Sequence, residues 1–276
     1  MKKTTTQSEV RHFTFCRPSI PTSEFEVHLG QIRAWGRPMS YKQFCPIAKA
    51  TEILGERWTI LIVREVLMGA SRFTEIQRGL GDISPALLTN RLKALEANNM
   101  VIKRKIPGQR GFEYFPTEAT ENLLPVLVSL GEWGLTWARH TLWEGDFDVE
   151  FLMRYLERSV DPEKIPGKET VVLFKFKDLA ELQEQSDFWL LVEGNDVQLC
   201  LKDPGRDISV YFNCTVRTMH DVWMGDRTYK EAIAAGDLIV EGEPGLTRNI
   251  RSWLRPSLFE ETQRAPIPDP LPTAIA

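Results

Sequence analysis

The chain has 276 residues, 42% of them hydrophobic, and a formal net charge of −4, which gives an isoelectric point near 5.7. This length predicts two domains, and the acidic balance excludes a protein coated in positive charge, although a local basic patch could still bind phosphates. No stretch reaches the ~20 apolar residues of a membrane span, and no apolar segment follows Met1, Lys2 and Lys3 as in a secretory signal. We therefore expect a cytoplasmic protein with no membrane partner.

The two ends of the chain differ in composition from its middle. Residues 1–38 mix Thr, Ser, Pro and Arg without a helical or strand period, which predicts a weakly ordered arm. Met39 stands just before the first convincing helix, so a start of translation at this residue is one hypothesis. Residues 260–276 are rich in proline and predict an extended or disordered tail.

Apolar residues at helical spacing predict four helices between residues 45 and 98. The first begins at Cys45. The second follows Gly55 and ends before Gly69, and the third runs over residues 73–80. Together with the fourth helix they give the alternation of helices and short turns that a small DNA-binding domain uses.

The fourth of these helices has one apolar face and one polar face. Ser84 is a favourable N-cap, and Pro85 occupies the first helical position, where its missing N–H costs nothing. The spacing of Leu88, Leu92 and Leu95 directs these three side chains to the core. The same geometry turns other residues outward or to the flanks, and these are Ala86, Thr89, Asn90, Arg91 and Lys93.

A β-hairpin with a basic tip follows this helix, with strands over residues 100–106 and 112–115 and a loop over residues 107–111. Its basic side chains are Lys103, Arg104, Lys105 and Arg110. A polar helix face alone is usually no more than a solvated surface. A basic hairpin directly after such a helix is typical of the wing of a winged helix-turn-helix domain.

We therefore expect residues 39–145 to form a mainly α winged helix-turn-helix domain whose partner is double-stranded DNA. Arg72, at the start of the third helix, either contacts a phosphate or only solvates the helix end. The expected DNA contacts are Arg72, Ser84, Thr89, Asn90, Arg91, Lys93, Lys103, Arg104, Lys105 and Arg110.

This domain contains a series of short motifs: Cys45-Pro46, Gly55-Glu-Arg-Trp-Thr59, Arg72-Phe73, Ile83-Ser84, Leu88-Thr-Asn-Arg-Leu92, Leu95-Glu96 and Gly131-Glu-Trp-Gly134. With these motifs the sequence closely resembles the HxlR family of bacterial winged-helix regulators. The resemblance implies a homodimer on palindromic operator DNA, with residues 84–98 as recognition helix and residues 103–110 as wing. It also implies that the first helix and residues 118–142 form the dimer interface. The sequence departs from the family at Pro85-Ala86 and at Phe115-Pro116-Thr117.

Cys45 lies at a position that serves as a redox or electrophile sensor in some members of that family. Only Lys42 and Lys49 stand near it in the sequence to activate a thiol, so an inert core cysteine is the favoured alternative. The four cysteines and four histidines of the chain lack the CxxC and HxxxH spacings of metal sites. We expect neither a metal nor a cofactor.

The second half of the chain predicts a different architecture. Residues 118–142 read as a long apolar-rich helix that Pro125 kinks near its start. Residues 146–259 begin with a helix and then read as an α+β domain. Its predicted strands are residues 170–176, 187–193, 197–201, 208–214 and 238–241.

The end of this domain carries Asp221-Val-Trp223, Gly225-Asp226, Glu231-Ala232 and the run from Ala235 to Gly242. These residues look like the end of a sterol-carrier-protein-2 (SCP2) domain. The resemblance implies a sheet covered by helices, with an apolar tunnel for lipid-like molecules between Val171 and Leu254, and no catalysis.

Strand alternation makes Trp189 and Phe212 candidate ligand-pocket residues, with ordinary core packing as the alternative. His220-Asp221 has no nucleophile in a recognisable context, so we do not expect an enzyme.

These patterns predict a bacterial DNA-binding regulator that is a homodimer and responds to an apolar small-molecule effector in an SCP2-like domain. The alternative is a lipid-binding carrier or interaction protein whose winged helix no longer recognises DNA. The charges of the wing discriminate between the two, because they matter for DNA binding and not for binding an apolar ligand.

Overall fold

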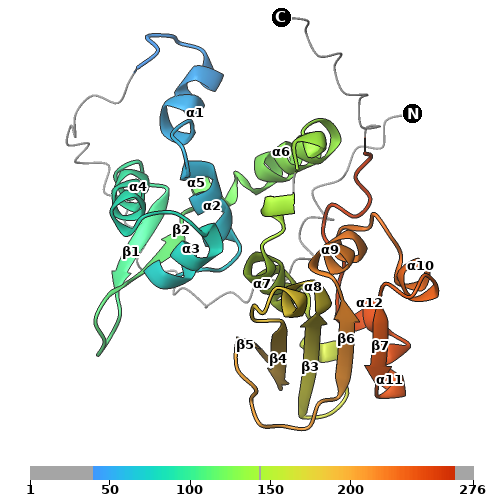
Figure 1. Cartoon of the computed structure of the whole chain (residues 1–276). Helices are drawn as coiled ribbons and strands as arrows, with labels where there is room; N and C mark the ends of the chain where they lie inside the picture. Colours follow the sequence, from blue (N-terminus) through green and yellow to red (C-terminus); the bar gives the residue numbers. More distant parts are fainter. Residues whose placement is uncertain (1–39, 143, 265–276) are drawn as a thin grey trace, which may run out of the picture. The chain divides into compact units, whose positions relative to one another are not determined.

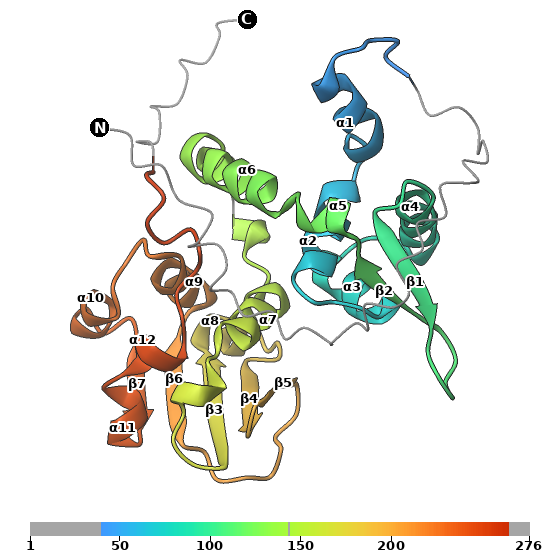
Figure 2. The ribbon, with the colours of Figure 1, turned by 180° about the vertical axis from the view of Figure 1, so that it is seen from behind.

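The computed structural model describes residues 40–142 and 144–264, so the arm expected over residues 1–38, the candidate start Met39 and residues 265–276 of the tail lie outside the described residues. The described residues divide into two compact units, which meet in the sequence between Leu130 and Gly131 (Figures 1 and 2). No helix among the described residues is long and apolar enough to cross a membrane.

The N-terminal unit combines short helices with one antiparallel hairpin. Its elements are α1 (Pro46–Leu54), α2 (Thr59–Leu67), α3 (Phe73–Leu80), α4 (Pro85–Ala97), β1 (Val101–Lys105), β2 (Phe112–Pro116) and α5 (Glu118–Glu121). The Ser84 hydroxyl accepts a hydrogen bond from the backbone N–H of Leu87 at 3.3 Å and so caps α4 as the sequence predicts. The apolar faces of α2, α3 and α4 meet in one core, which Tyr114 of β2 completes.

Gly79 lets α3 approach a buried carboxylate on α2. Glu65 is fully buried beside Arg64, whose Nη2 also donates to the Gly79 carbonyl oxygen at 3.2 Å. A Cβ atom on Gly79 would collide with the Glu65 carboxylate. We therefore expect Gly79→Ala to lower the free energy of unfolding by about 1–3 kcal/mol, because the overlap has to be relieved inside a packed core.

Urea denaturation followed by circular dichroism measures this effect. Gly245→Ala is the matched control, because a Cβ there meets no atom within 4 Å. Equal midpoints for the two variants would contradict the prediction.

The long helix expected over residues 118–142 is divided in the structure. α5 ends at Glu121, and α6 (Leu124–Trp137) begins two turn residues later, followed by the 3₁₀ turn η3 (Arg139–Thr141). Pro125 is the second residue of α6 and therefore helps to start a helix rather than kink one, since the first helical N–H groups need no intrahelical acceptor.

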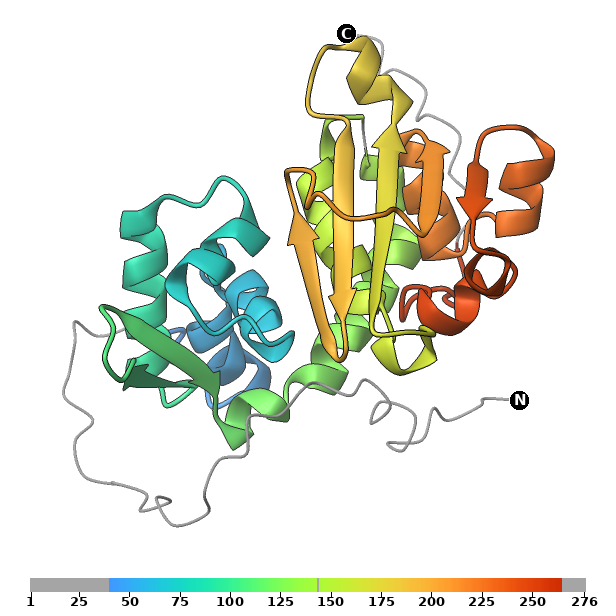
Figure 3. The same cartoon turned by 90° about the horizontal axis from the view of Figure 1, so that it is seen from below.

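The C-terminal unit is an α+β structure built on a mixed sheet. Its strands are β3 (Glu169–Phe176), β4 (Asp187–Glu193), β5 (Asp196–Cys200), β6 (Val210–Cys214) and β7 (Ile239–Gly242). The strand order in the described chain is β5-β4-β3-β6-β7, with only the β3–β6 pair parallel. The segment between β5 and β6 crosses one face of the sheet (Figure 3).

Helices cover the other face of this sheet. α7 (Val149–Ser159) and α9 (Val216–Met224) pack on Phe174, Phe188 and Phe212, which sit side by side in the strand register. Shorter elements complete the unit: η4 (Glu144–Asp146), η5 (Pro162–Lys164), α8 (Lys177–Glu181), α10 (Tyr229–Ala234), α11 (Pro244–Thr247) and α12 (Ile250–Trp253).

Residues 257–264, which we call the strap, explain why the division between the units falls inside α6 and not at the predicted boundary near residue 145. The Phe259 ring packs directly on Gly131, leaving no room for a Cβ atom there. The Thr136 hydroxyl donates to the Gln263 carbonyl oxygen at 2.8 Å. The C-terminal half of α6 thus packs on the strap and is part of the second unit.

Candidate nucleic-acid interface

α4 presents a polar face that nothing in the described chain covers. Thr89, Asn90 and Lys93 are exposed, whereas Leu88 and Leu92 on the opposite face are buried. The Thr89 hydroxyl donates to the Pro85 carbonyl oxygen at 2.8 Å, which leaves the methyl group and the lone pairs of the hydroxyl oxygen available. The predicted recognition surface is therefore accessible to a partner.

Arg91 differs from the other predicted contacts on α4 because it is already engaged. Its Nη2 atom lies 2.7 Å from Glu56 Oε2, and its Nε donates to the Arg57 carbonyl oxygen at 3.1 Å. The side chain therefore joins α4 to the segment between α1 and α2. We interpret Arg91 as a residue that positions α4 and not as a free cation.

The cations of the hairpin fall on two faces. Lys103 pairs with Tyr114 and Arg104 with Glu113 in the strand register, so that their side chains point in opposite directions. Lys103 Nζ lies 4.1 Å from the centre of the Phe112 ring, and the Arg104 guanidinium lies 5.3 Å from that of Phe115. These cation–π contacts fix the orientation of two cations along the hairpin.

The tip of the hairpin carries the cations that remain available. Lys105 and Arg110 are exposed, and their side chains make no hydrogen bond, ion pair or ring contact with the described residues. Arg72, the N-cap residue of α3, reaches the same loop, because its Nη1 donates to Gln109 Oε1 at 3.3 Å. The structure thus brings Arg72 to the base of the basic tip.

Sequence reasoning missed the residues that support these cations. Phe112 and Phe115 stand under Lys103 and Arg104, Gln109 holds Arg72, and Glu56 holds Arg91. The two phenylalanines could have been found from the alternation of the hairpin, which places them across from the basic strand. The contacts of Gln109 and Glu56 join residues far apart in sequence and carry no local signal.

Cys45 is neither buried in the core nor paired with a cation. It is half-buried at the N-cap of α1. Lys49, one of the two predicted activators, forms an ion pair with Glu52 at 2.9 Å. By contrast, Cys214 is fully buried, and burial raises the pKa of its thiol to about 12, so this thiol is inert.

The expectation that Trp189 and Phe212 line one pocket is wrong. The register aligns Phe212 with Phe174 and Phe188 on the helix-covered face, whereas Trp189 aligns with Leu173 and lies on the other face. Phe212 has no exposed surface, and its ring stacks on Phe174 at 4.8 Å between centres. It is a core residue, and the two side chains cannot share a ligand.

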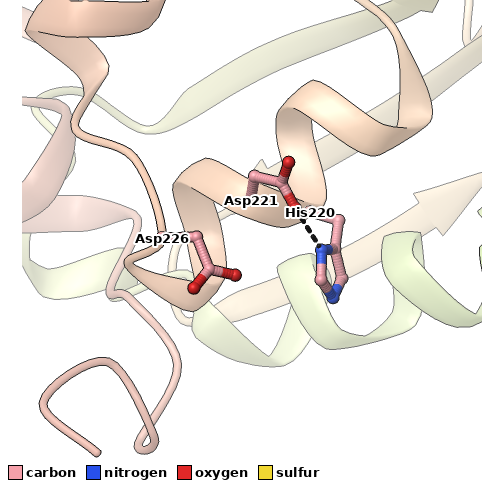
Figure 4. Close-up of side chains that lie close together, drawn as sticks. All are labelled: His220, Asp221 and Asp226. Atoms are coloured by element: carbon pink, nitrogen blue, oxygen red, sulfur yellow. Dashed lines mark hydrogen bonds and ion pairs between the residues drawn. The ribbon is translucent and has the colours of Figure 1, made fainter. Parts of the chain in front are cut away.

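His220 and Asp221 lie near a third polar residue in the fold, which the sequence did not indicate. Asp226 lies close to both in space (Figure 4), and one ligand atom from each of the three lies within 4.8 Å of the others. Arginines already neutralise both carboxylates, with Asp226 contacting Arg139 and Arg264, and Asp221 contacting Arg217. The cluster therefore works as an ion-pair network that ties η3 and the strap to α9.

Comparison with known proteins relates the N-terminal part of the chain to a family. Residues 53–142 match the family model described as HxlR-like helix-turn-helix. The HTH-type transcriptional regulator YvaP of Bacillus subtilis is 37% identical over 101 residues, which cover 36% of this chain and 94% of that protein. YkvN, an HTH-type transcriptional regulator of the same organism, is 29% identical over 108 residues, or 38% of this chain and 90% of that protein.

Among solved structures, the reduced form of the transcriptional regulator YodB from B. subtilis matches with 33% identity and a TM-score of 0.30, covering 33% of this chain and 92% of that one. Residues 53–142, which match the family model, include α4 and the basic hairpin, and the matches to YvaP and YkvN cover 94% and 90% of those proteins. The chain belongs to the HxlR-like helix-turn-helix family.

Proposed function

We propose that the protein is a DNA-binding transcriptional regulator that acts as a homodimer on palindromic operator DNA. Its relatives YvaP and YkvN are named as HTH-type transcriptional regulators. α4 is the recognition helix in this proposal, and the hairpin β1–β2 is the wing. The observation that carries it is the exposed polar face of α4 next to a hairpin whose tip holds the unpaired cations Lys105 and Arg110.

The residues of the interface divide by role. In this proposal Lys93, Lys105, Arg110 and Arg72 contact phosphates, which supplies affinity without sequence information. Asn90 and Thr89 are exposed on α4 and have the donors and acceptors needed to read base edges in the major groove. Ser84 caps the helix, and Arg91 orients it through Glu56.

Exposed apolar side chains support the homodimer. Val126, Leu130, Trp133 and Trp137 follow one another at helical spacing along α6, and all are exposed. Ile47 of α1 is exposed as well. Monomeric proteins rarely leave such a row uncovered, and a second copy related by twofold symmetry would present the same row in return.

The C-terminal α+β unit is the proposed sensor, in keeping with its resemblance to the SCP2 family. An effector can change operator affinity only if it binds the two dimer geometries with different affinity. α6 is the proposed link, because its N-terminal half packs in the first core through Leu124 and Leu127 while its C-terminal half contacts the strap. If operator affinity did not change at a saturating effector concentration, the proposed sensor role of the C-terminal unit would be wrong.

Replacing Lys105 and Arg110 by alanine tests the role in DNA binding. Each lost phosphate contact should reduce the slope of log affinity against log salt concentration by about 1, and affinity should fall for operator and unrelated DNA alike. Fluorescence anisotropy with the protein's own upstream DNA, at several salt concentrations, measures both quantities.

The matched control is Lys164→Ala with Lys168→Ala, two exposed lysines of the C-terminal unit. An unchanged salt slope in the wing variant would contradict the proposed interface. Equal weak binding of the native protein to operator and unrelated DNA would favour the second candidate, a carrier or interaction protein with a DNA-silent winged helix. The Pro85-Ala86 start of α4 is the feature that favours this candidate.

A further inference from the structure

A groove on the C-terminal unit runs between α10 and the segment that contains α11 and α12. Its volume is about 680 Å³, within the range of about 300–1,000 Å³ that small-molecule sites occupy. Tyr229, Lys230, Ile233 and Ala234 line it from α10, and residues 247–252 line it from the other side. Neither Trp189 nor Phe212 lines this groove.

The groove combines an apolar floor with a cationic rim. Ile233, Ala234 and Ile250 supply aliphatic surface, and Ile233 is exposed although it is a large apolar residue. Lys230, Arg248 and Arg251 supply positive charge, and no acidic side chain lines the groove. An apolar surface bordered by charge of one sign is complementary to an amphipathic molecule of the opposite charge.

The three cations are not equally available. Arg251 holds Glu260 of the strap in a double ion pair, with Nη1 and Nη2 at 2.6 Å and 2.9 Å from the two carboxylate oxygens. The side chains of Lys230 and Arg248 make no hydrogen bond, ion pair or ring contact within the described part of the chain. Their charges are therefore free to meet an anion from solution.

Tyr229 adds a polar group at the same place. Burial raises the pKa of its phenol, so the hydroxyl keeps its proton and can donate a hydrogen bond. No residue within the described ranges accepts from it. Tyr229 lines the groove, so this hydroxyl can donate to an acceptor that arrives with a ligand.

We propose that this groove binds an amphipathic organic anion, whose carboxylate lies between Lys230 and Arg248 and whose hydrocarbon body covers Ile233, Ala234 and Ile250. This inference rests on the proposed function and deepens it, since it gives the effector a chemical class and a site. Octanoate is the probe, because it has one carboxylate and a short aliphatic body. Octanol and acetate separate the contributions of the body and the charge.

Isothermal titration calorimetry of octanoate with the full chain, in the absence of DNA, is the test. We expect one saturable site per chain and affinity at least about tenfold lower when Lys230 and Arg248 are replaced by alanine. The control variant Lys164→Ala with Lys168→Ala should bind as the native protein does. Because no DNA is present, a negative result here leaves the DNA-binding role intact, and loss of operator binding leaves this site intact.

Glu260→Gln gives a test with the opposite sign. It releases Arg251 from its ion pair without changing the size of the side chain, so octanoate should bind about two- to fivefold more tightly. The proposal would be overturned if octanol bound as tightly as octanoate. It would also be overturned if acetate bound as tightly as octanoate. Unchanged octanoate affinity in the Lys230→Ala, Arg248→Ala variant would also overturn it.

Discussion

Replacing Trp133 and Trp137 by glutamate is expected to convert the proposed dimer into a monomer and to weaken operator binding by about 10²–10⁴-fold. The two rings lie one turn apart on α6 and are 58% and 61% exposed, so a partner has to cover them. Tryptophan buries about 150–250 Å² when covered, and a carboxylate at the same place would be buried without a partner. Loss of the dimer lowers operator affinity. When one subunit of a dimer is bound to its half-site, the second subunit is held at a high effective concentration near the other half-site, and a monomer lacks this advantage.

Light scattering coupled to size-exclusion chromatography measures the assembly, and a gel shift with operator DNA measures the affinity. Leu182→Glu with Leu201→Glu is the control, because both leucines are exposed apolar residues of the C-terminal unit that do not belong to α6. This control should leave mass and affinity unchanged. A Trp133→Glu, Trp137→Glu protein that elutes with the native mass would show that α6 is not the interface.

Phe212→Ala is expected to destabilise the C-terminal unit by about 3–5 kcal/mol, the cost of removing a fully buried aromatic side chain. The ring packs between Phe174, at 4.8 Å between centres, and Trp253, at 6.3 Å. Its removal leaves a cavity that the sheet and α12 cannot easily fill. The same substitution at a residue that lined an open ligand pocket would lower the free energy of unfolding much less.

Tyr211→Ala is the matched control, since Tyr211 is the adjacent residue of β6, points to the other face and is 38% exposed. Urea denaturation followed by circular dichroism should show a large decrease in midpoint for Phe212→Ala and a small one for Tyr211→Ala. Similar midpoints would mean that Phe212 is not a core residue.

Local patterns in the sequence determine most of the elements. α3 and β4 have the predicted boundaries, residues 73–80 and 187–193, because helical and strand periods are properties of short segments. Ser84 and Pro85 mark the start of α4 for the same reason, since capping involves only the first turn. The exposed face of α4 follows from its leucine spacing alone.

The extent of the apolar helix at residues 118–142 was only partly determined by the sequence. Its apolar composition predicts one helix, but a helix start at Leu124 satisfies Pro125 without a kink. The assignment of its C-terminal half to the second unit depends on the strap, whose Phe259 contacts Gly131 across more than a hundred residues of chain. No local pattern can report such a contact.

The sequence by itself determined the family, the helix and hairpin that form the candidate interface, and the identity of its cations. Only the tertiary structure decided which cations are free, because Arg91 pairs with Glu56 and Arg72 meets Gln109 through contacts between distant segments. It also decided that Trp189 and Phe212 lie on opposite faces of the sheet, since strand register depends on pairing and not on composition. Periodicity fixes which side chains share a face of one element, whereas packing fixes what that face meets.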